Sequence, residues 1–213
     1  MRLILVYAEW SRVVKGILKC PPEGLFAPAD FPRKHVSISL QRNRLIVFPS
    51  DLGWMGLIGA GKVLKALTFG HTTEEAAARA LGRLGNQTAG GAWNEPLVRR
   101  LKAYAAGVPV DFSDIVVGPG HLTDFQRRVL KQCRKISYGR TRTYGQLASL
   151  SGSPRAGRAV GSCMAANPIP LVIPCHRVVR SDGRVGCYSS VGGTKTKARL
   201  LAMESAPRQP ERQ

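Results

Sequence analysis

Acidic residues are scarce in this sequence, and long apolar runs are missing from it. Only 13 of the 213 residues are Asp or Glu, against 32 Lys and Arg, which gives a formal net charge of +19. No apolar run approaches the roughly 20 residues that a bilayer-spanning helix needs, so we expect no membrane partner. The apolar stretch at the N-terminus meets Glu9 too early for a signal peptide and is predicted to form a strand, Leu3–Tyr7.

Paired cysteine motifs are also missing. The five cysteines are widely scattered, without the Cys-x-x-Cys or Cys/His spacing of a zinc site, and Cys20 is the only one before Cys133. This usage is typical of free thiols in a reducing, intracellular compartment. We therefore expect no metal site and no cofactor.

The basic excess is unevenly distributed along the chain. Residues 118–213 contain 17 basic and 4 acidic residues, whereas residues 1–117 contain 15 and 9. Such a concentration favours a polyanionic partner, with nucleic acid ahead of a membrane surface. A solvated basic surface, as in a thermophile or a halotolerant cell, is the alternative, but it does not explain the asymmetry.

The first half of the chain is predicted to form a small α/β domain without a catalytic constellation. Val36–Leu40 and Arg44–Phe48 have the composition of strands, and the glycine-rich stretch 51–61 is ambiguous. Helices are expected after Thr72-Thr73 and after Asn94. The second helix carries four residues on one apolar face: Leu97, Leu101, Tyr104 and Ala105. Residues 108–120 form a Pro- and Gly-rich connector, which divides the chain into domains 1–117 and 118–213.

The second domain begins with a capping box. Thr123 and Gln126 have the spacing of that motif and predict a helix over Asp124–Ile136. Its inward face would hold Phe125, Val129, Leu130, Cys133 and Ile136. Its outward face would hold Arg127, Arg128, Lys131, Arg134 and Lys135. A basic face of one helix is usually just solvated, but the further basic residues nearby favour a surface that contacts phosphates.

A helix-turn-helix pattern follows. Tyr144–Leu150 is a predicted helix with Leu147 and Leu150 as apolar contacts, Gly152 breaks it, and Ser153-Pro154 is a start signal for a helix Arg155–Ala166. That second helix is rich in Ala, Gly and Ser and has one long cation, Arg158, near its middle. Small residues let a backbone approach a DNA groove closely, with Arg158 as a wedge. Packing of these small residues inside the domain explains the pattern equally well.

The segment Asn167–Val178 reads Asn-Pro-Ile-Pro-Leu-Val-Ile-Pro-Cys-His-Arg-Val. Its prolines exclude a helix interior and predict a stiff, extended, buried segment that ends at Cys175. A base beside a thiol favours the thiolate. Adjacent side chains of an extended chain diverge, however, so a chance pairing of Cys175 with His176 stays open. A last helix, Lys195–Glu204, would place Glu204 at its C-terminal end, where a carboxylate needs a partner such as His176.

This segment closely resembles the active-site signature of the O6-alkylguanine-DNA alkyltransferases (methylated-DNA–protein-cysteine methyltransferases). Arg158-Ala-Val-Gly161 and Tyr144-Gly-Gln-Leu-Ala are also similar to that family's helix-turn-helix. The resemblance is strong from Asp124 to Glu204. It implies a ribonuclease-H-like α/β N-terminal domain with a small sheet, and a mainly α, winged-helix-like C-terminal DNA-binding domain.

The resemblance also implies roles for individual residues. Cys175 would accept the alkyl group, His176 would take the thiol proton through a water, Glu204 would orient His176, and Asn167 would brace the backbone. The implied substrate-binding residues are Tyr144, Ser189, Tyr188, Met164, Pro170 and Val178. The implied DNA-binding residues are Arg158, Tyr144, Gln126, Ser153, Ser181 and Arg155. Arg158 would fill the gap left by a flipped nucleotide.

The function that follows is direct-reversal DNA repair, with irreversible transfer of one alkyl group per protein molecule from guanine O6 to Cys175. The expected partner is double-stranded DNA containing O6-alkylguanine, bound by a monomer in the cytoplasm and nucleoid, or in the nucleus of a eukaryote. The alternatives are a non-catalytic damage-recognition or regulatory DNA-binding protein and a Cys-His hydrolase. One departure is a loop, Tyr188–Gly193, that is two residues longer than the family's Tyr-Ser-Gly-Gly.

Overall fold

The computed structural model describes residues 42–82, 87–89 and 93–205. The expected strands Leu3–Tyr7 and Val36–Leu40 lie outside the described residues. No helix in the described ranges is long and apolar enough to cross a membrane.

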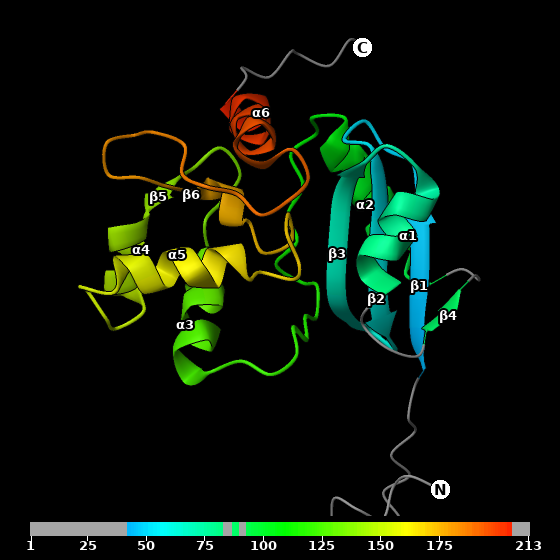
Figure 1. The fold of residues 1–213 in the computed structure, drawn as a ribbon, viewed down its shortest axis with the longest axis horizontal. Coiled ribbons are helices and arrows are strands. Elements are labelled where there is room, and N and C mark those ends of the chain that lie inside the picture. The colour runs from blue at the N-terminus through cyan, green and yellow to red at the C-terminus, as the bar shows by residue number, and fades with distance from the viewer. Residues whose placement is uncertain (1–41, 83–86, 90–92, 206–213) are drawn as a thin grey trace, which may run out of the picture. The chain divides into compact units, whose positions relative to one another are not determined.

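The first half of the described chain forms a small, mostly antiparallel sheet (Figure 1). Its strands are β1 (Asn43–Phe48), β2 (Trp54–Ala60), β3 (Val63–His71) and β4 (Gln87–Ala89), in the spatial order β3-β2-β1-β4. β1 and β3 pair with β2 in antiparallel fashion, whereas β4 runs parallel to β1. The strand expected at Arg44–Phe48 is confirmed.

The ambiguous glycine-rich stretch is strand β2, and packing explains its glycines. A Cβ at Gly59 would clash with the ring of Trp93, and a Cβ at Gly56 would lie 2.8 Å from the side chain of Leu81. Leu57 and Ile58 alternate between the two faces, so Leu57 belongs to the main core and Ile58 packs with Leu81. Glycine here makes room for large neighbours rather than for a turn.

Two helices follow the strands at the predicted caps. α1 (Glu74–Leu81) begins after Thr73, whose side chain accepts a hydrogen bond from the amide of Ala76. α2 (Glu95–Ala105) begins after Asn94, whose side chain accepts from the amide of Leu97. The predicted apolar face of α2 is confirmed, because all four of its residues are buried: Leu97, Leu101, Tyr104 and Ala105.

The second half is mainly helical (Figure 1). Its helices are α3 (Asp124–Cys133), α4 (Tyr144–Leu150), α5 (Gly157–Ala165) and α6 (Gly193–Ser205). Short elements complete it: strands β5 (Arg142–Thr143) and β6 (Val178–Val179), which pair in parallel, and the 3₁₀ turn η2 (Cys175–Arg177). Both sides of the predicted capping box between Thr123 and Gln126 are present.

Three predicted details of these helices are wrong. α5 starts at Gly157 and Ser153 does not cap it, because a turn closed by the Ala156 amide and the Ser153 carbonyl precedes the helix. α3 ends at Cys133, where the amide of Ile136 bonds to the carbonyl of Cys133. Leu150 is 46% exposed and does not belong to the buried core.

One continuous hydrophobic core joins the sheet to the helices. It includes Leu57 and Phe69 from the sheet, Leu101 from α2, Val160 from α5 and Leu200 from α6. The segment around Cys175 is part of the same core. The position of the thiol is therefore fixed by packing against elements from both halves of the chain.

Candidate active site

The segment before Cys175 is buried as predicted, but it is folded into tight turns rather than extended. The amide of Ile173 donates to the carbonyl of Ile169, at 2.9 Å, and Leu171 between them has a φ of +69°. A positive φ is uncommon for a bulky residue and needs support from its surroundings. Asn167 supplies it, because its side chain accepts from the Ile169 amide at 3.1 Å and donates to the Ile173 carbonyl at 2.8 Å.

Cys175 lies at the end of these turns, 3% exposed. The same Asn167 amide group is 3.1 Å from its Sγ atom and donates a hydrogen bond to it. Burial raises the pKa of the Cys175 thiol, while the hydrogen bond from Asn167 and the charge of Lys197 oppose this rise. The resting thiol is therefore protonated and depends on a base to become a nucleophile.

His176 is fully buried directly beside Cys175. The two residues lie on a 3₁₀ turn and not on an extended chain, so the argument from an extended chain does not apply to them. Nε2 of His176 is 2.9 Å from Oε1 of Glu204, whereas Nδ1 is buried with no hydrogen-bond partner among the described residues. Burial lowers the pKa of His176 and keeps the ring neutral. A carboxylate at Nε2 fixes the hydrogen there, so Nδ1 is free to accept a proton.

Glu204 is the centre of this buried network. Nε and Nη2 of Arg177 donate to its carboxylate at 2.9 Å, and the backbone amide of Gly139 donates at 3.1 Å. Burial alone would raise the pKa of Glu204, but the hydrogen bonds from His176 and Arg177 outweigh it and lower the pKa to about 2. These partners explain how a carboxylate is tolerated at the C-terminal end of α6.

Two members of the site escaped the sequence analysis. The hydroxyl of Tyr104, on α2, donates to Oε1 of Glu204 at 2.6 Å and lies 3.2 Å from Nε2 of His176. The first half of the chain thus contributes to the site, contrary to the prediction. The spacing on α2 placed Tyr104 on a buried face, but nothing local indicates what its hydroxyl meets.

Lys197 is the second missed residue. It is 1% exposed, and its ammonium group donates to the carbonyl of Val178 at 2.5 Å and to the hydroxyl of Tyr144 at 3.3 Å. Burial lowers the pKa of Lys197, and the charge of Cys175 works in the opposite direction. Its spacing of three and seven residues from Leu200 and Glu204 on the last helix is the signal that could have identified it.

A cavity of about 680 Å³ lies where α4, α5 and the loop before α6 meet. It collects five of the predicted substrate- and DNA-binding residues: Tyr144, Arg158, Ser181, Tyr188 and Ser189. The hydroxyl of Tyr188 is buried and interacts with the thiol of Cys175. Aromatic and cationic groups at one opening suit a planar, electron-rich ligand.

The small residues of α5 divide between an exposed face and a face that packs inside the domain. Arg158, Ala159, Ser162 and Ala165 are exposed, whereas Val160 on the opposite side is buried. The exposed side is therefore available to another surface. Two glycines face α4 instead, since Cβ atoms at Gly157 and Gly161 would lie about 4 Å from the backbone of Gly145 and the ring of Tyr144.

The remaining predicted residues lie away from this cavity or below the surface. Pro170 is buried near Cys175, and Met164 and Val178 belong to the core. The side chain of Gln126 is engaged in the cap of α3, and Ser153 is half-buried in the turn before α5. Arg155 is exposed in the turn that precedes α5.

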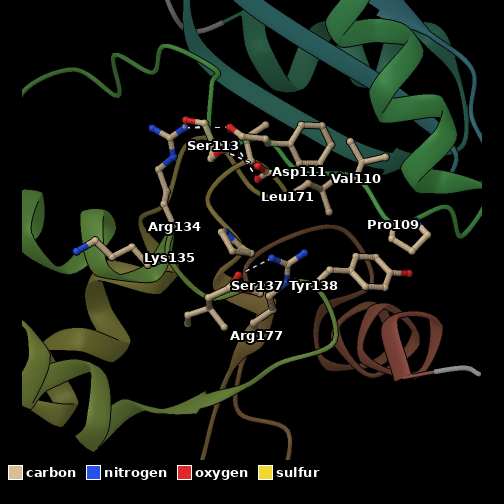
Figure 2. Close-up of a pocket in the computed structure, with 14 residues that line it drawn as sticks. Pro109, Val110, Asp111, Ser113, Arg134, Lys135, Ser137, Tyr138, Leu171 and Arg177 are labelled. Atoms are coloured by element: carbon tan, nitrogen blue, oxygen red, sulfur yellow. Dashed lines mark hydrogen bonds between the residues drawn. The ribbon is translucent and has the colours of Figure 1, made fainter.

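A further cavity, of about 540 Å³, lies beside Arg177 (Figure 2). Nη1 of Arg177 donates to the Ile136 carbonyl at 2.6 Å, and its guanidinium lies 5.7 Å from the ring centre of Tyr138. Arg134 donates to the carbonyls of Phe112, Ser113 and Ile115. The prediction that Arg134 faces phosphates is therefore wrong, because backbone carbonyls engage its guanidinium.

Comparison with known proteins shows which family has a similar sequence. A family model described as the DNA-binding domain of 6-O-methylguanine DNA methyltransferase matches residues 124–206. The methylated-DNA–protein-cysteine methyltransferase of Mycobacterium leprae is 38% identical over 155 residues, which cover 73% of this chain and 88% of that protein. The chain belongs to the methylated-DNA–protein-cysteine methyltransferase family.

Solved structures of this methyltransferase family agree with the fold. The Mycobacterium tuberculosis O6-methylguanine methyltransferase has a TM-score of 0.62 and 36% identity, over 79% of this chain and 96% of that one. The mouse methylated-DNA–protein-cysteine methyltransferase is 54% identical over 84 residues, which are 39% of each chain. The match thus spans about two fifths of the length of the mouse relative.

Proposed function

We propose that the protein repairs DNA by transferring an alkyl group from guanine O6 to Cys175, irreversibly and once per molecule. The observation that carries this proposal is the buried thiol of Cys175 next in the chain to His176, whose Nε2 bonds to Glu204 and whose Nδ1 has no hydrogen-bond partner among the described residues. A protonated thiol beside a neutral imidazole needs only one proton transfer to become a nucleophile.

The reaction balances with the groups present. A water between the two side chains carries the thiol proton to Nδ1 of His176, and Glu204 stabilises the imidazolium through Nε2. The Sγ atom forms a bond to the alkyl carbon while the bond from that carbon to O6 breaks. The electron pair stays with the guanine, which takes back a proton as it leaves as the normal base. The product is a thioether, which is not a leaving group at neutral pH, so the protein is consumed.

Double-stranded DNA is the proposed partner, and the damaged nucleotide must leave the stack. A thiol that is 3% exposed cannot reach a paired base, so flipping is required and costs a few kcal/mol. The exposed small side chains of α5 allow close approach to a groove, and Arg158 is positioned to fill the space that the nucleotide leaves. Tyr144 and Ser189 would contact the flipped guanine in the cavity they line.

We assign these roles to two domains, with residues 118–213 as a winged-helix-like DNA-binding unit that acts as a monomer. Residues 1–117 would form the ribonuclease-H-like part. A DNA-bound structure of the Mycobacterium tuberculosis relative, at 34% identity and a TM-score of 0.64, supports DNA as the partner.

Mass spectrometry after reaction with duplex DNA containing O6-methylguanine tests the proposal. We expect the peptide containing Cys175 to gain one methyl group, with a plateau at one equivalent per protein. Cys175→Ser should abolish the transfer and Cys163→Ser should leave it intact. An unmodified Cys175 would contradict the proposal, and continued product release beyond one equivalent would indicate a hydrolase.

A further inference from the structure

Cys175 opens into a second, smaller cavity of about 270 Å³, which is separate from the one lined by Arg158. One side of it comes from the active-site segment and the following loop, with Pro170, Cys175 and Tyr188. The other side comes from strand β3, with Thr68 and His71. Tyr188 and Ser189 line both cavities, so the two share a wall next to the thiol.

The loop that follows Tyr188 covers this cavity and rests on β3. Val191 lies over Gly70, where an added Cβ would be 3.3 Å from the Cβ of Val191. The Val191 carbonyl accepts a hydrogen bond from the hydroxyl of Thr196 at 2.6 Å, which ties the loop to the first turn of α6. The longer loop therefore encloses space beside the thiol instead of filling it.

The size of the cavity exceeds what a methyl group needs. One water molecule takes up about 30 Å³ in the liquid, and a methyl group is of similar size. A cavity of about 270 Å³ leaves room for several further atoms next to Sγ. A longer alkyl chain on guanine O6 could extend into it once the base lies in the neighbouring cavity.

The β3 side of the cavity carries hydrogen-bonding groups. Oγ1 of Thr68 lies 2.7 Å from Nε2 of His71, and both residues are partly exposed. No hydrogen bond connects Nδ1 of His71 to the described part of the chain. Burial lowers the pKa of His71, so the ring is a neutral donor or acceptor. A neutral imidazole paired with a hydroxyl suits a neutral polar group better than a hydrocarbon end.

We propose that this cavity receives the distal part of the alkyl group and that His71 and Thr68 favour chains ending in a hydroxyl, such as 2-hydroxyethyl. The inference rests on the proposed function and adds its substrate class. The transferred group would end as an S-(2-hydroxyethyl) thioether on Cys175, with its hydroxyl bonded to the β3 side.

Single-turnover rates with three DNA duplexes test the inference. The duplexes carry O6-methylguanine, O6-propylguanine or O6-(2-hydroxyethyl)guanine, of which the last two are nearly equal in size. We expect the wild-type protein to react faster with the hydroxyethyl than with the propyl duplex. His71→Phe and Thr68→Val should each lower this ratio about twofold to tenfold, the value of one hydrogen bond. His121→Phe, at an exposed histidine just before α3, should keep the wild-type ratio.

The ratio cancels any general loss of activity in a variant. An unchanged ratio in both His71→Phe and Thr68→Val, or a wild-type ratio at or below one, would overturn the inference while leaving methyl transfer established. Absence of transfer from all three duplexes to wild-type Cys175 would overturn the proposed function and this inference together.

Discussion

Tyr104 and Glu204 are separated by 100 residues and joined by a hydrogen bond of 2.6 Å. The bond connects α2, which packs on the sheet, to the last helix, which holds the partner of His176. A hydroxyl from the first half of the chain therefore helps to hold the carboxylate of the second.

Replacing Tyr104 by Phe should destabilise the protein and slow transfer. A hydrogen bond to a charged group contributes about 1.5–3 kcal/mol to stability. The other donors to Glu204 compensate for only part of this loss. Urea unfolding measures the loss. Tyr138→Phe is the control, because its hydroxyl bonds to carbonyls at the longer distances of 3.3 and 3.4 Å. Equal losses in both variants would contradict a special role for Tyr104.

Acid should destabilise the protein through Glu204 in a defined pH window. Its folded pKa of about 2 lies below the ordinary 4.5, so its contribution is complete above pH 4.5 and is lost as pH falls towards 2. The free energy of unfolding, measured across this window, should fall less steeply in Glu204→Gln than in the wild type. If the free energy of unfolding fell with the same slope in both proteins, the fold would not be stabilising the charged form of Glu204.

The rate of alkyl transfer should stay constant to below pH 6.5. Burial lowers the pKa of His176 from 6.5, and the base acts in its neutral form, so protonation stops the reaction only at more acidic pH. Single-turnover rates between about pH 5 and about pH 8 check this. A fall in rate centred above pH 6.5 would mean that the charge of Glu204 raises the pKa of His176 by more than burial lowers it.

Lys197→Met should reduce the reactivity of Cys175. The charge of Lys197 opposes the rise in the thiol pKa that burial causes, so its removal raises that pKa further. We expect slower transfer and a shift of iodoacetamide labelling at Cys175 to higher pH. Lys195→Met, at an exposed lysine two residues earlier, should leave both unchanged. An unshifted labelling profile in Lys197→Met would limit Lys197 to a structural role.

Arg158→Ala should slow transfer from duplex DNA far more than transfer from the free base O6-benzylguanine. The side chain is exposed on α5 and is needed only when a nucleotide leaves the stack. Arg79→Ala, an exposed arginine on α1, controls for loss of one positive charge. Equal slowing on both substrates would exclude the role of Arg158 in filling the gap.

The sequence predicted features that depend on neighbours along the chain. Three helix starts were predicted correctly, at Thr73, Asn94 and Thr123. In each, the side chain of the capping residue accepts a hydrogen bond from the backbone amide three residues later. The burial of the segment that ends at Cys175 was also predicted. The true start of α5 was not, because Ser153-Pro154 fits a turn as well as a helix start.

Features that depend on distant contacts could not be predicted. The guanidinium of Arg134 bonds to backbone carbonyls about 20 residues away, and the hydroxyl of Tyr104 bonds to a carboxylate 100 residues away. Lys197 would have been assigned to solvent by residue type alone, since buried lysines are rare. Tyr104 is brought to His176, and His71 to the cavity beside Cys175, by packing that no local sequence pattern describes.

The continuous core between the sheet and η2 has a consequence for local opening. The core residues of α2 pack in the same cluster as Cys175, and the hydroxyl of Tyr104 on α2 lies within hydrogen-bond distance of His176. In native-state hydrogen exchange, elements that open together share one opening free energy. The backbone amides around Cys175 and those of the sheet would then exchange with one common opening free energy, while the amides of the loop at Val191 exchange sooner.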